Sequence, residues 1–199
     1  MPRSKPPQPN DASDAALLAA AAAGEEPAFV ELYRRRRDDV YRFAYALTRC
    51  RSSAQDTTQE VFLGVLENAG RFDPAKGSVR AWLVGCARHI MIDRLRRDSR
   101  WADEAPERAV ACDKEQRVLT EQRLARLHAA IVRLPFEYRE ALALCELAEL
   151  SYAEAAAVLD CPLGTIRSRL HRARGLLATA LRRAESDGET ALQPTEACS

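Results

Sequence analysis

The chain has 199 residues, of which 47% are hydrophobic and 30% are charged, and its formal net charge is +1. This composition excludes a wholly disordered chain, because there is enough apolar surface to build a packed core. It also favours helices, since alanine, leucine and arginine are abundant and only 6% of the residues are aromatic. The sequence has no signal-peptide core and no apolar run of membrane-spanning length. We therefore expect a cytoplasmic protein of one or two domains.

The N-terminal half is predicted to be a tail followed by helices. Proline-rich and polar residues at the start predict a largely disordered tail over 1–24. Helical spacing of apolar residues begins near Asp14 and continues to about Leu47, with a break at Gly24 and Pro27. Three more segments are expected: a helix that Ser52 or Ser53 caps and that ends near Ala69, a glycine- and proline-containing loop over 68–78, and a helix over 79–97.

A polar, proline-containing stretch over 99–113 separates two helical blocks and predicts a flexible linker. The blocks are residues 25–98 and 114–183, and the polar tail 184–199 is expected to be disordered. The second block is expected to contain helices over 114–133 and 135–148, and a short helix that opens with the capping-box pair Ser151 and Glu154. The fold class is therefore all-α, with two small helical domains whose relative arrangement the sequence leaves open.

The segment DCPLGTIRSRLHRAR, residues 160–174, carries four arginines on one short predicted helix. A short capped helix, a turn and then a basic helix are typical of a helix-turn-helix, whose second helix enters the DNA major groove. At about 100° per residue, the expected buried face holds Leu163, Ile166, Leu170, Ala173 and Leu177, and the opposite face holds Gly164, Ser168, His171, Arg172 and Gly175. On pattern alone, a solvated amphipathic helix of an ordinary bundle is an equal alternative.

Residues 134–177, LPFEYREALALCELAELSYAEAAAVLDCPLGTIRSRLHRARGLL, resemble the promoter-binding region of bacterial sigma-70 family sigma factors of the extracytoplasmic-function group. The specific pieces are LPxxxRxAxxL, the LSYAEAAxxL helix and PxGTIRSRLxRAR. The resemblance implies that the last helix binds the −35 promoter element, through Arg167, Ser168, His171 and Arg172, with Thr165, Arg169 and Arg174 beside them.

Residues 29–97 resemble the other domain of that family, which grips RNA polymerase and helps to open the −10 element; the pieces that carry the likeness are AQDTTQEVFL and AWLVGCARHIMIDRLRR. On the helix over 56–69, Asp56, Glu60, Leu63 and Glu67 lie opposite the expected buried face of Thr58, Val61, Phe62, Val65, Leu66 and Ala69. Such an acidic stripe is often only solvated, but an exposed leucine within it favours a partner surface. The resemblance names the clamp helices of the polymerase β′ subunit as partner of Asp56, Gln59 and Glu60, and Leu63 joins them because it lies exposed within the acidic stripe.

The resemblance also implies residues that bind the −10 element. On the helix over 79–97 these are Arg88, His89, Arg96 and Arg97, while Trp82 is interpreted as a core residue. The loop over 68–78 is expected to form a pocket for an unstacked base, through Asn68, Arg71, Phe72 and Lys76. For Phe72 a place in the core is an equal alternative.

These observations predict a sigma factor that binds core polymerase (the β′ clamp helices and the β subunit) and promoter DNA, and the family implies a cognate anti-sigma factor. The alternative is a helix-turn-helix repressor or activator that binds DNA without polymerase. An enzyme is disfavoured, because the three histidines have no matching nucleophile or carboxylates and no phosphate-binding glycine loop is present. The six cysteines form no C-x-x-C pair, so we expect neither a metal nor another cofactor, with redox or metal sensing a minor alternative.

Overall fold

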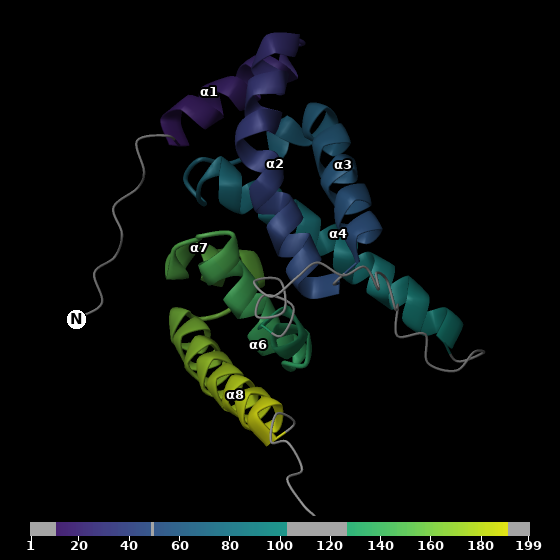
Figure 1. Ribbon diagram of the computed structural model, residues 1–199. Coiled ribbons are helices and arrows are strands. Elements are labelled where there is room, and N and C mark those ends of the chain that lie inside the picture. The colour runs from purple at the N-terminus through teal and green to yellow at the C-terminus, as the bar shows by residue number, and fades with distance from the viewer. Residues whose placement is uncertain (1–10, 49, 103–126, 191–199) are drawn as a thin grey trace, which may run out of the picture.

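The computed structural model describes residues 11–48, 50–102 and 127–190, and all regular elements in these ranges are helices (Figure 1). This confirms the all-α fold class. The N-terminal domain contains α1 (Asp11–Ala22), α2 (Glu26–Thr48), α3 (Arg51–Asn68), the short 3₁₀-helix η1 (Ala69–Arg71) and α4 (Val79–Ala102). The C-terminal domain contains a helical turn at 127–132, α6 (Phe136–Leu142), the π-helical turn η2 (Ala143–Leu147), α7 (Tyr152–Leu159) and α8 (Leu163–Thr190).

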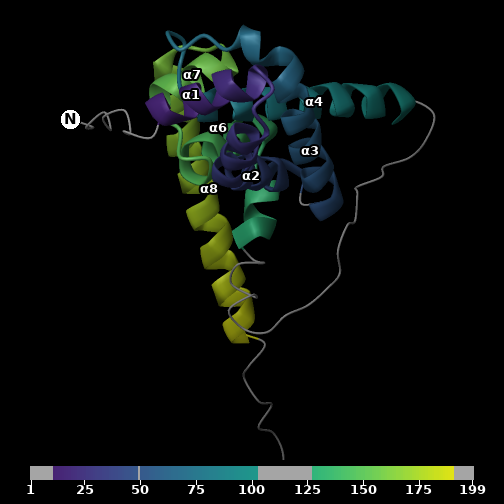
Figure 2. The same ribbon diagram turned by 90° about the horizontal axis from the view of Figure 1, so that it is seen from above.

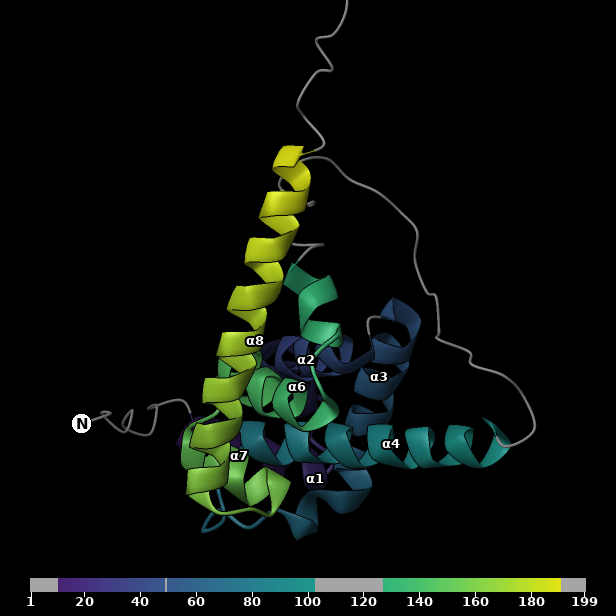
Figure 3. The ribbon, with the colours of Figure 1, turned by 90° about the horizontal axis from the view of Figure 1, so that it is seen from below.

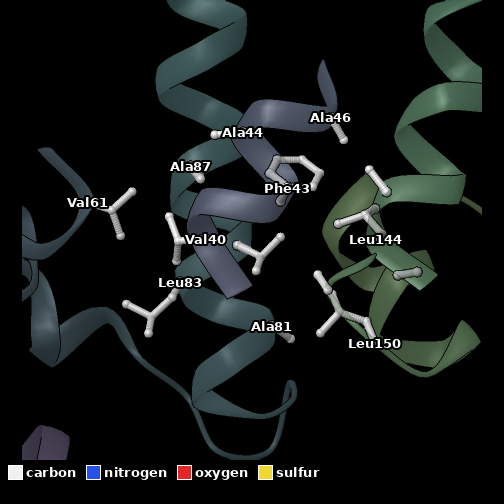
Figure 4. Close-up of a cluster of buried hydrophobic side chains, with 14 of the residues drawn as sticks. Val40, Phe43, Ala44, Ala46, Val61, Ala81, Leu83, Ala87, Leu144 and Leu150 are labelled. Carbon is white, nitrogen blue, oxygen red and sulfur yellow. The ribbon is translucent and has the colours of Figure 1, made fainter. Parts of the chain in front are cut away.

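Helix α2 is the centre of the N-terminal domain and packs against α1, α3 and α4. Its apolar residues recur at helical spacing, so that Leu32, Val40 and Phe43 are fully buried. Figure 4 shows Val40 and Phe43 beside Leu83 and Ala87 of α4, with Val61 of α3 on the side away from Leu144. The three long helices therefore enclose one core, and this core positions the outward faces of α3 and α4.

Helix α1 differs from the expectation of a largely disordered tail over 1–24. Leu18 is buried, and the carboxylate of Asp14 is completely inaccessible to solvent. The guanidinium Nε of Arg36 on α2 donates to Asp14 Oδ2 at 2.5 Å, and Arg35 Nη1 donates to Asp14 Oδ1 at 3.3 Å. Because these ion pairs join residues far apart in sequence, local composition gives no sign of them. Residues 1–10 lie outside the described part of the chain.

Three helix ends differ from the predicted ones. Helix α3 is capped by Cys50, whose Sγ accepts from the Ser53 backbone N–H at 3.5 Å, and not by the hydroxyl of Ser52 or Ser53. Helix α4 continues into the expected linker, and no proline interrupts its sequence before Pro106. Helix α8 likewise continues into the expected tail, where the first proline is Pro194. The rest of the linker, the tail beyond 190 and the predicted helix over 114–126 lie outside the described residues.

The C-terminal domain contains the predicted helix-turn-helix. The capping box at α7 is confirmed: Ser151 Oγ accepts from the Glu154 N–H at 3.2 Å, and Glu154 Oε2 accepts from the Ser151 N–H at 2.9 Å. Asp160 ends α7 in the left-handed region, with φ of 48°, and so turns the chain toward α8. The predicted helix over 135–148 ends in the π-helical turn η2.

Helix α8 packs on α6 and α7. Ile166, Leu170 and Ala173 are buried as predicted, but Leu163 is 36% exposed. The prediction for Leu163 was wrong because this residue begins the helix, before the point where α6 and α7 cover it.

The two domains pack against each other, an arrangement that the sequence left open. Helices α2 and α4 of the N-terminal domain contact α6, η2 and α7 of the C-terminal domain. Figures 1, 2 and 3 show α6 and α7 next to α2 and α4, with α8 running along the outer side of α6 and α7. Leu144 and Leu150 belong to the same hydrophobic core as Phe43, so the domains share one core in this conformation.

Candidate nucleic-acid interface

Five of the seven residues predicted to bind the −35 element are exposed on α8: Arg167, Ser168, His171, Arg172 and Arg174. His171 lies three positions after Ser168 and four after Arg167, so these three exposed side chains lie on one side of the helix. Ser168 Oγ donates to the Thr165 carbonyl at 3.0 Å. Gly164 on the same side has open space where a side chain would stand. The face therefore offers hydrogen-bonding groups on a surface that another molecule can approach closely.

The other arginines of α8 contact their own domain. Arg172 Nη1 donates to the Tyr138 hydroxyl at 3.2 Å, and Arg174 donates to the Glu146 carboxylate. These hydrogen bonds, to Tyr138 and Glu146 respectively, raise the pKa of the two guanidinium groups, so both remain charged. Arg169 lies 4.0 Å from Glu137 of α6, and Thr165 is half-buried.

The six predicted residues other than Thr165 are therefore divided into two groups by their contacts. Arg167, Ser168 and His171 form the outward face, which we call the reading face. The arginines at 169, 172 and 174 contact Glu137, Tyr138 and Glu146 respectively, and so hold α8 against α6 and η2.

The predicted polymerase-binding residues Asp56, Gln59, Glu60 and Leu63 are all exposed on α3, and Leu63 is 66% exposed. Glu60 Oε2 accepts from Arg94 Nη2 of α4 at 2.5 Å, and the same arginine donates to Thr57 Oγ1 at 3.0 Å. Arg94 was not predicted, and it restrains Glu60 on the surface of α3.

Leu66 corrects the predicted buried face of α3. It is 50% exposed, because α2 covers the side of α3 that carries Val61, Phe62 and Val65 and does not reach it. Two exposed leucines, Leu63 and Leu66, therefore lie one turn apart beside the acidic residues.

The four residues of α4 predicted to bind the −10 element point in two directions. His89 is exposed, with Nδ1 2.9 Å from the Gly85 carbonyl, and Arg97 Nε donates to the Asp93 carbonyl at 3.2 Å. Arg96 is exposed and lies 3.8 Å from the Asp93 carboxylate. Arg88, in contrast, turns toward the C-terminal domain.

Arg88 is held by a carboxylate of the C-terminal domain. Its Nε donates to Glu140 Oε1 at 2.6 Å, and the side chain of Glu140 is only 4% exposed. Glu140 was missed from the sequence, although a signal was present. It lies one turn before Leu144 on a face of otherwise apolar residues, and a charge at such a position needs a partner.

The predicted base-pocket residues do not form one group. Arg71 and Lys76 are exposed, and Asn68 Nδ2 donates to the Gly64 carbonyl at 2.9 Å. Phe72 is half-buried, with its ring edge-on to Trp82 at a centroid distance of 5.9 Å. This contact agrees with the core alternative for Phe72 and with the core interpretation of Trp82.

Four cysteines lie in the described residues and form no disulfide there: Cys50, Cys86, Cys145 and Cys161. Burial raises the pKa of Cys86, and burial together with the charge of Glu146 raises the pKa of Cys145 to about 12. These two thiols therefore stay protonated near neutral pH and are poor nucleophiles. In residues 11–48, 50–102 and 127–190, no cluster of histidine, cysteine and carboxylate side chains could hold a metal ion. No helix within these ranges could cross a membrane.

The structure combines a helix-turn-helix that has a basic reading face with a second helical domain that has an acidic and apolar face. This combination defines a two-domain promoter-recognition protein. Family models agree: sigma-70 region 2 matches residues 32–101 and sigma-70 region 4 matches residues 124–177. The sigma factor SigC of Mycobacterium tuberculosis is 40% identical over 178 residues, which cover 86% of this chain and 93% of that one. SigM of the same species is 34% identical, with 86% of each chain covered.

Solved structures of sigma factors are also similar. CnrH in complex with the cytosolic domain of CnrY matches with a TM-score of 0.68 and 25% identity, over 86% of this chain and 98% of that one. RpoE of Bartonella quintana, bound to the anti-sigma factor NepR, matches with a TM-score of 0.67 and 25% identity, over 77% and 96%. The chain belongs to the sigma-70 family, in its extracytoplasmic-function group. It is a sigma factor, a protein that directs RNA polymerase to promoters.

Proposed function

We propose that this sigma factor divides its work between its two domains. The N-terminal domain binds core polymerase through the exposed face of α3 and binds the −10 element through α4 and the loop after α3. The C-terminal domain binds the −35 element through α8. The observation that carries this division is the separation of charge: acidic side chains and Leu63 lie exposed on α3, while Arg167 and His171 lie exposed on α8.

At the −35 element, the reading face of Arg167, Ser168 and His171 contacts base edges and phosphates. The planar guanidinium of Arg167 suits the two acceptors of guanine in the major groove. Arg169, Arg172 and Arg174 hold the helix in place and reach phosphates at its edges, and Thr165 supports the first turn. The tight packing of Ile166 and Leu170 supports this role, because it fixes the direction of the exposed side chains.

At the −10 element, His89, Arg96 and Arg97 face the DNA, together with Asn68, Arg71 and Lys76 of the loop. Phe72 supports the loop through Trp82. Arg88 joins this set when the domains separate. Promoter melting follows from binding of an unstacked base, which offsets the loss of stacking.

On the polymerase side, Asp56, Gln59, Glu60 and Leu63 contact the β′ clamp helices, and the C-terminal domain contacts the β subunit. We further propose a cognate anti-sigma factor, since the two similar solved sigma factors named above are complexes, one of them with a named anti-sigma factor. The protein acts in the cytoplasm by binding and performs no chemistry itself.

The test is promoter-directed transcription with the purified full chain, bacterial core polymerase and a promoter library. Initiation that requires both the chain and the core polymerase supports the proposal. Leu63→Ala should weaken binding to core polymerase, whereas Leu176→Ala, which changes another exposed leucine (45% exposed) on α8, should not. If the chain binds specific DNA alone and confers no initiation, the repressor alternative replaces this proposal.

A further inference from the structure

A buried ion pair joins α1 to α2 within the N-terminal domain. The side chain of Asp14 has no accessible surface, and that of Arg36 is 10% exposed. Arg36 Nε donates to Asp14 Oδ2 at 2.5 Å, and Arg35 Nη1 donates to Asp14 Oδ1 at 3.3 Å. Arg36 Nη1 also donates to Asp39 at 3.3 Å. Loss of the charge at Asp14 would therefore leave a buried guanidinium with only part of its compensation.

Helix α1 needs such a contact to define its position. Its sequence, DASDAALLAAAA, is mostly alanine, and a helix of 12 residues is marginal by itself in water. Small side chains interlock little with their neighbours, so apolar contacts alone do not specify one arrangement. A buried ion pair has the opposite property: it adds little net stability, because desolvation offsets the attraction, but only one arrangement satisfies it.

Two attachments tie α1 to α2, one near each end. At its C-terminal end the chain turns at Gly24, with φ of 93°, a conformation that favours glycine, and α2 begins at Glu26. Near its N-terminal end Asp14 is bound to Arg36 of α2. Between these points Leu18 is 2% exposed and belongs to the core of the domain. Without the ion pair, the N-terminal part of α1 would be held only by such apolar contacts.

Helix α1 lies against the segment that follows α3. It contacts η1, and an apolar hollow between them is lined by residues of both segments, among them Leu18 and Ala22 of α1 and, opposite, Ala69, Gly70 and Phe72. The same segment carries the exposed side chain of Arg71. Phe72 contacts Trp82 on its other side. The position of α1 therefore sets how far this segment can move toward the interior of the domain.

We propose that Asp14 is a positioning residue for the −10 element: with Arg36 it fixes α1, and α1 supports η1 and Phe72 so that Arg71 is held toward the DNA. This inference rests on the proposed function, which assigns the loop after α3 to the −10 element. Asp14 itself contacts no DNA. It keeps the loop in one arrangement before binding, and this lowers the ordering cost that accompanies capture of an unstacked base.

The test compares Asp14→Asn with Asp38→Asn in the full chain. The first variant removes the buried charge with little change of shape. The second makes the same change at a carboxylate of α2 that is 71% exposed and pairs with Arg37. Holoenzyme at saturating concentration is mixed with a recognised promoter that carries 2-aminopurine in the −10 element, whose fluorescence rises when the base unstacks. We expect Asp14→Asn to slow melting about tenfold, which corresponds to about 1.4 kcal/mol, and Asp38→Asn to match the wild type.

Two further measurements separate positioning from a general loss of folded protein. A promoter whose −10 region is already melted needs no unstacking, so Asp14→Asn should initiate from it as the wild type does. Fewer folded molecules would instead lower initiation from both templates by the same factor. Acrylamide quenching of Trp82, in a Trp101→Phe background, reports the loop through the contact with Phe72. Quenching should increase in Asp14→Asn and stay unchanged in Asp38→Asn.

Leu18→Ala loosens α1 in a second way, because it removes a buried side chain and leaves the charges in place. It should also slow melting of the duplex promoter and be rescued by the melted one. Equal melting rates for Asp14→Asn and Asp38→Asn would overturn the positioning role and leave the sigma function standing, as would an equal loss on both templates. Unchanged quenching of Trp82 in both α1 variants would show that α1 does not support the loop. If the wild type initiates from neither template, the sigma function fails, and the positioning role fails with it.

Discussion

The two helices that carry the predicted DNA-binding residues, α4 and α8, differ in how their surfaces are used. Helix α8 packs on α6 and α7 of its own domain, while α4 packs on α2 and α3 and also on α7 of the other domain. The reading face of α8 is therefore complete within one domain. On α4, the side chain of Arg88 is bound to Glu140 of the other domain. A basic helix in a sequence thus predicts a DNA-binding surface, but not whether that surface is available.

The two helices also differ in what their arginines do. On α8, Arg172 and Arg174 contact Tyr138 and Glu146 of the same domain, so they hold the helix within that domain. On α4, the corresponding contact of Arg88 lasts only as long as the domain contact. Four experiments break or sharpen this comparison.

The largest effect is expected from a charge placed under the reading face. Ile166 is fully buried, so Ile166→Asp should lower the free energy of unfolding by about 4 kcal/mol or more. The control is Leu176→Asp, at an exposed position of the same helix, which should change stability by less than about 0.5 kcal/mol. Urea denaturation followed by circular dichroism measures both. Equal stability of the two variants would contradict the packing of α8.

The next effect concerns the reading face itself. Arg167→Ala should weaken binding to −35 DNA by about 1–3 kcal/mol, or roughly ten- to hundredfold, because a base-contacting arginine is lost. Arg133→Ala, an exposed arginine of the same domain before α6, is the matched control and should have little effect. Fluorescence anisotropy with the polymerase holoenzyme and promoter variants measures both. An equal loss for all DNA sequences would mean that Arg167 contacts phosphate rather than a base.

A smaller effect is expected at the domain contact. Burial raises the pKa of Glu154, but hydrogen bonds from Ser78 and Ser151 and the charge of Arg80 outweigh it, so that the pKa lies below its usual value. A lowered folded-state pKa gives stability that is present at neutral pH and is lost as pH falls below about 4.5 toward the folded-state pKa.

Ser78→Ala should therefore cost about 1 kcal/mol of stability at pH 7. The difference from the wild type should shrink in acid without vanishing, because Ser78 Oγ also accepts from the Ala81 N–H at 3.2 Å. Urea denaturation between pH 7 and pH 3 measures this, with Thr179→Ala on the exposed part of α8 as control. A constant difference across this range would show that Ser78 does not act through Glu154.

The smallest effect is expected for the edge of α8. Arg174 and Glu146 form an exposed pair, with 56% and 43% of their side chains accessible. Arg174→Ala should change stability by less than about 1 kcal/mol and should weaken −35 binding less than Arg167→Ala does. A double-mutant cycle with Glu146→Ala isolates the pair. A larger loss of DNA binding than at Arg167 would place Arg174 on the reading face.

Much of the secondary structure and of the helix-turn-helix could be predicted from the sequence, because local signals specify them. The period of apolar residues located the helices, the Ser151–Glu154 capping box opened α7, and Ile166 and Leu170 were correctly placed in the core. The wrong burial predictions concern residues that have the helical spacing of a buried face but are not covered by a neighbouring helix. Leu163 and Leu66 have the right spacing but lie beyond the cover of neighbouring helices.

The sequence by itself determined the family, the all-α class and the order of the domains, because these depend on local motifs and periodicity. Only the tertiary structure decided how α1 is anchored and how the domains meet. Asp14 pairs with Arg36, and Arg88 with Glu140, across distances that no local pattern encodes. The difference between Arg167 on the reading face and the arginines that contact α6 or η2 was also decided there, since it depends on where α6 and η2 place Tyr138 and Glu146. The physical reason is that a charged side chain takes its role from the partner that folding brings to it.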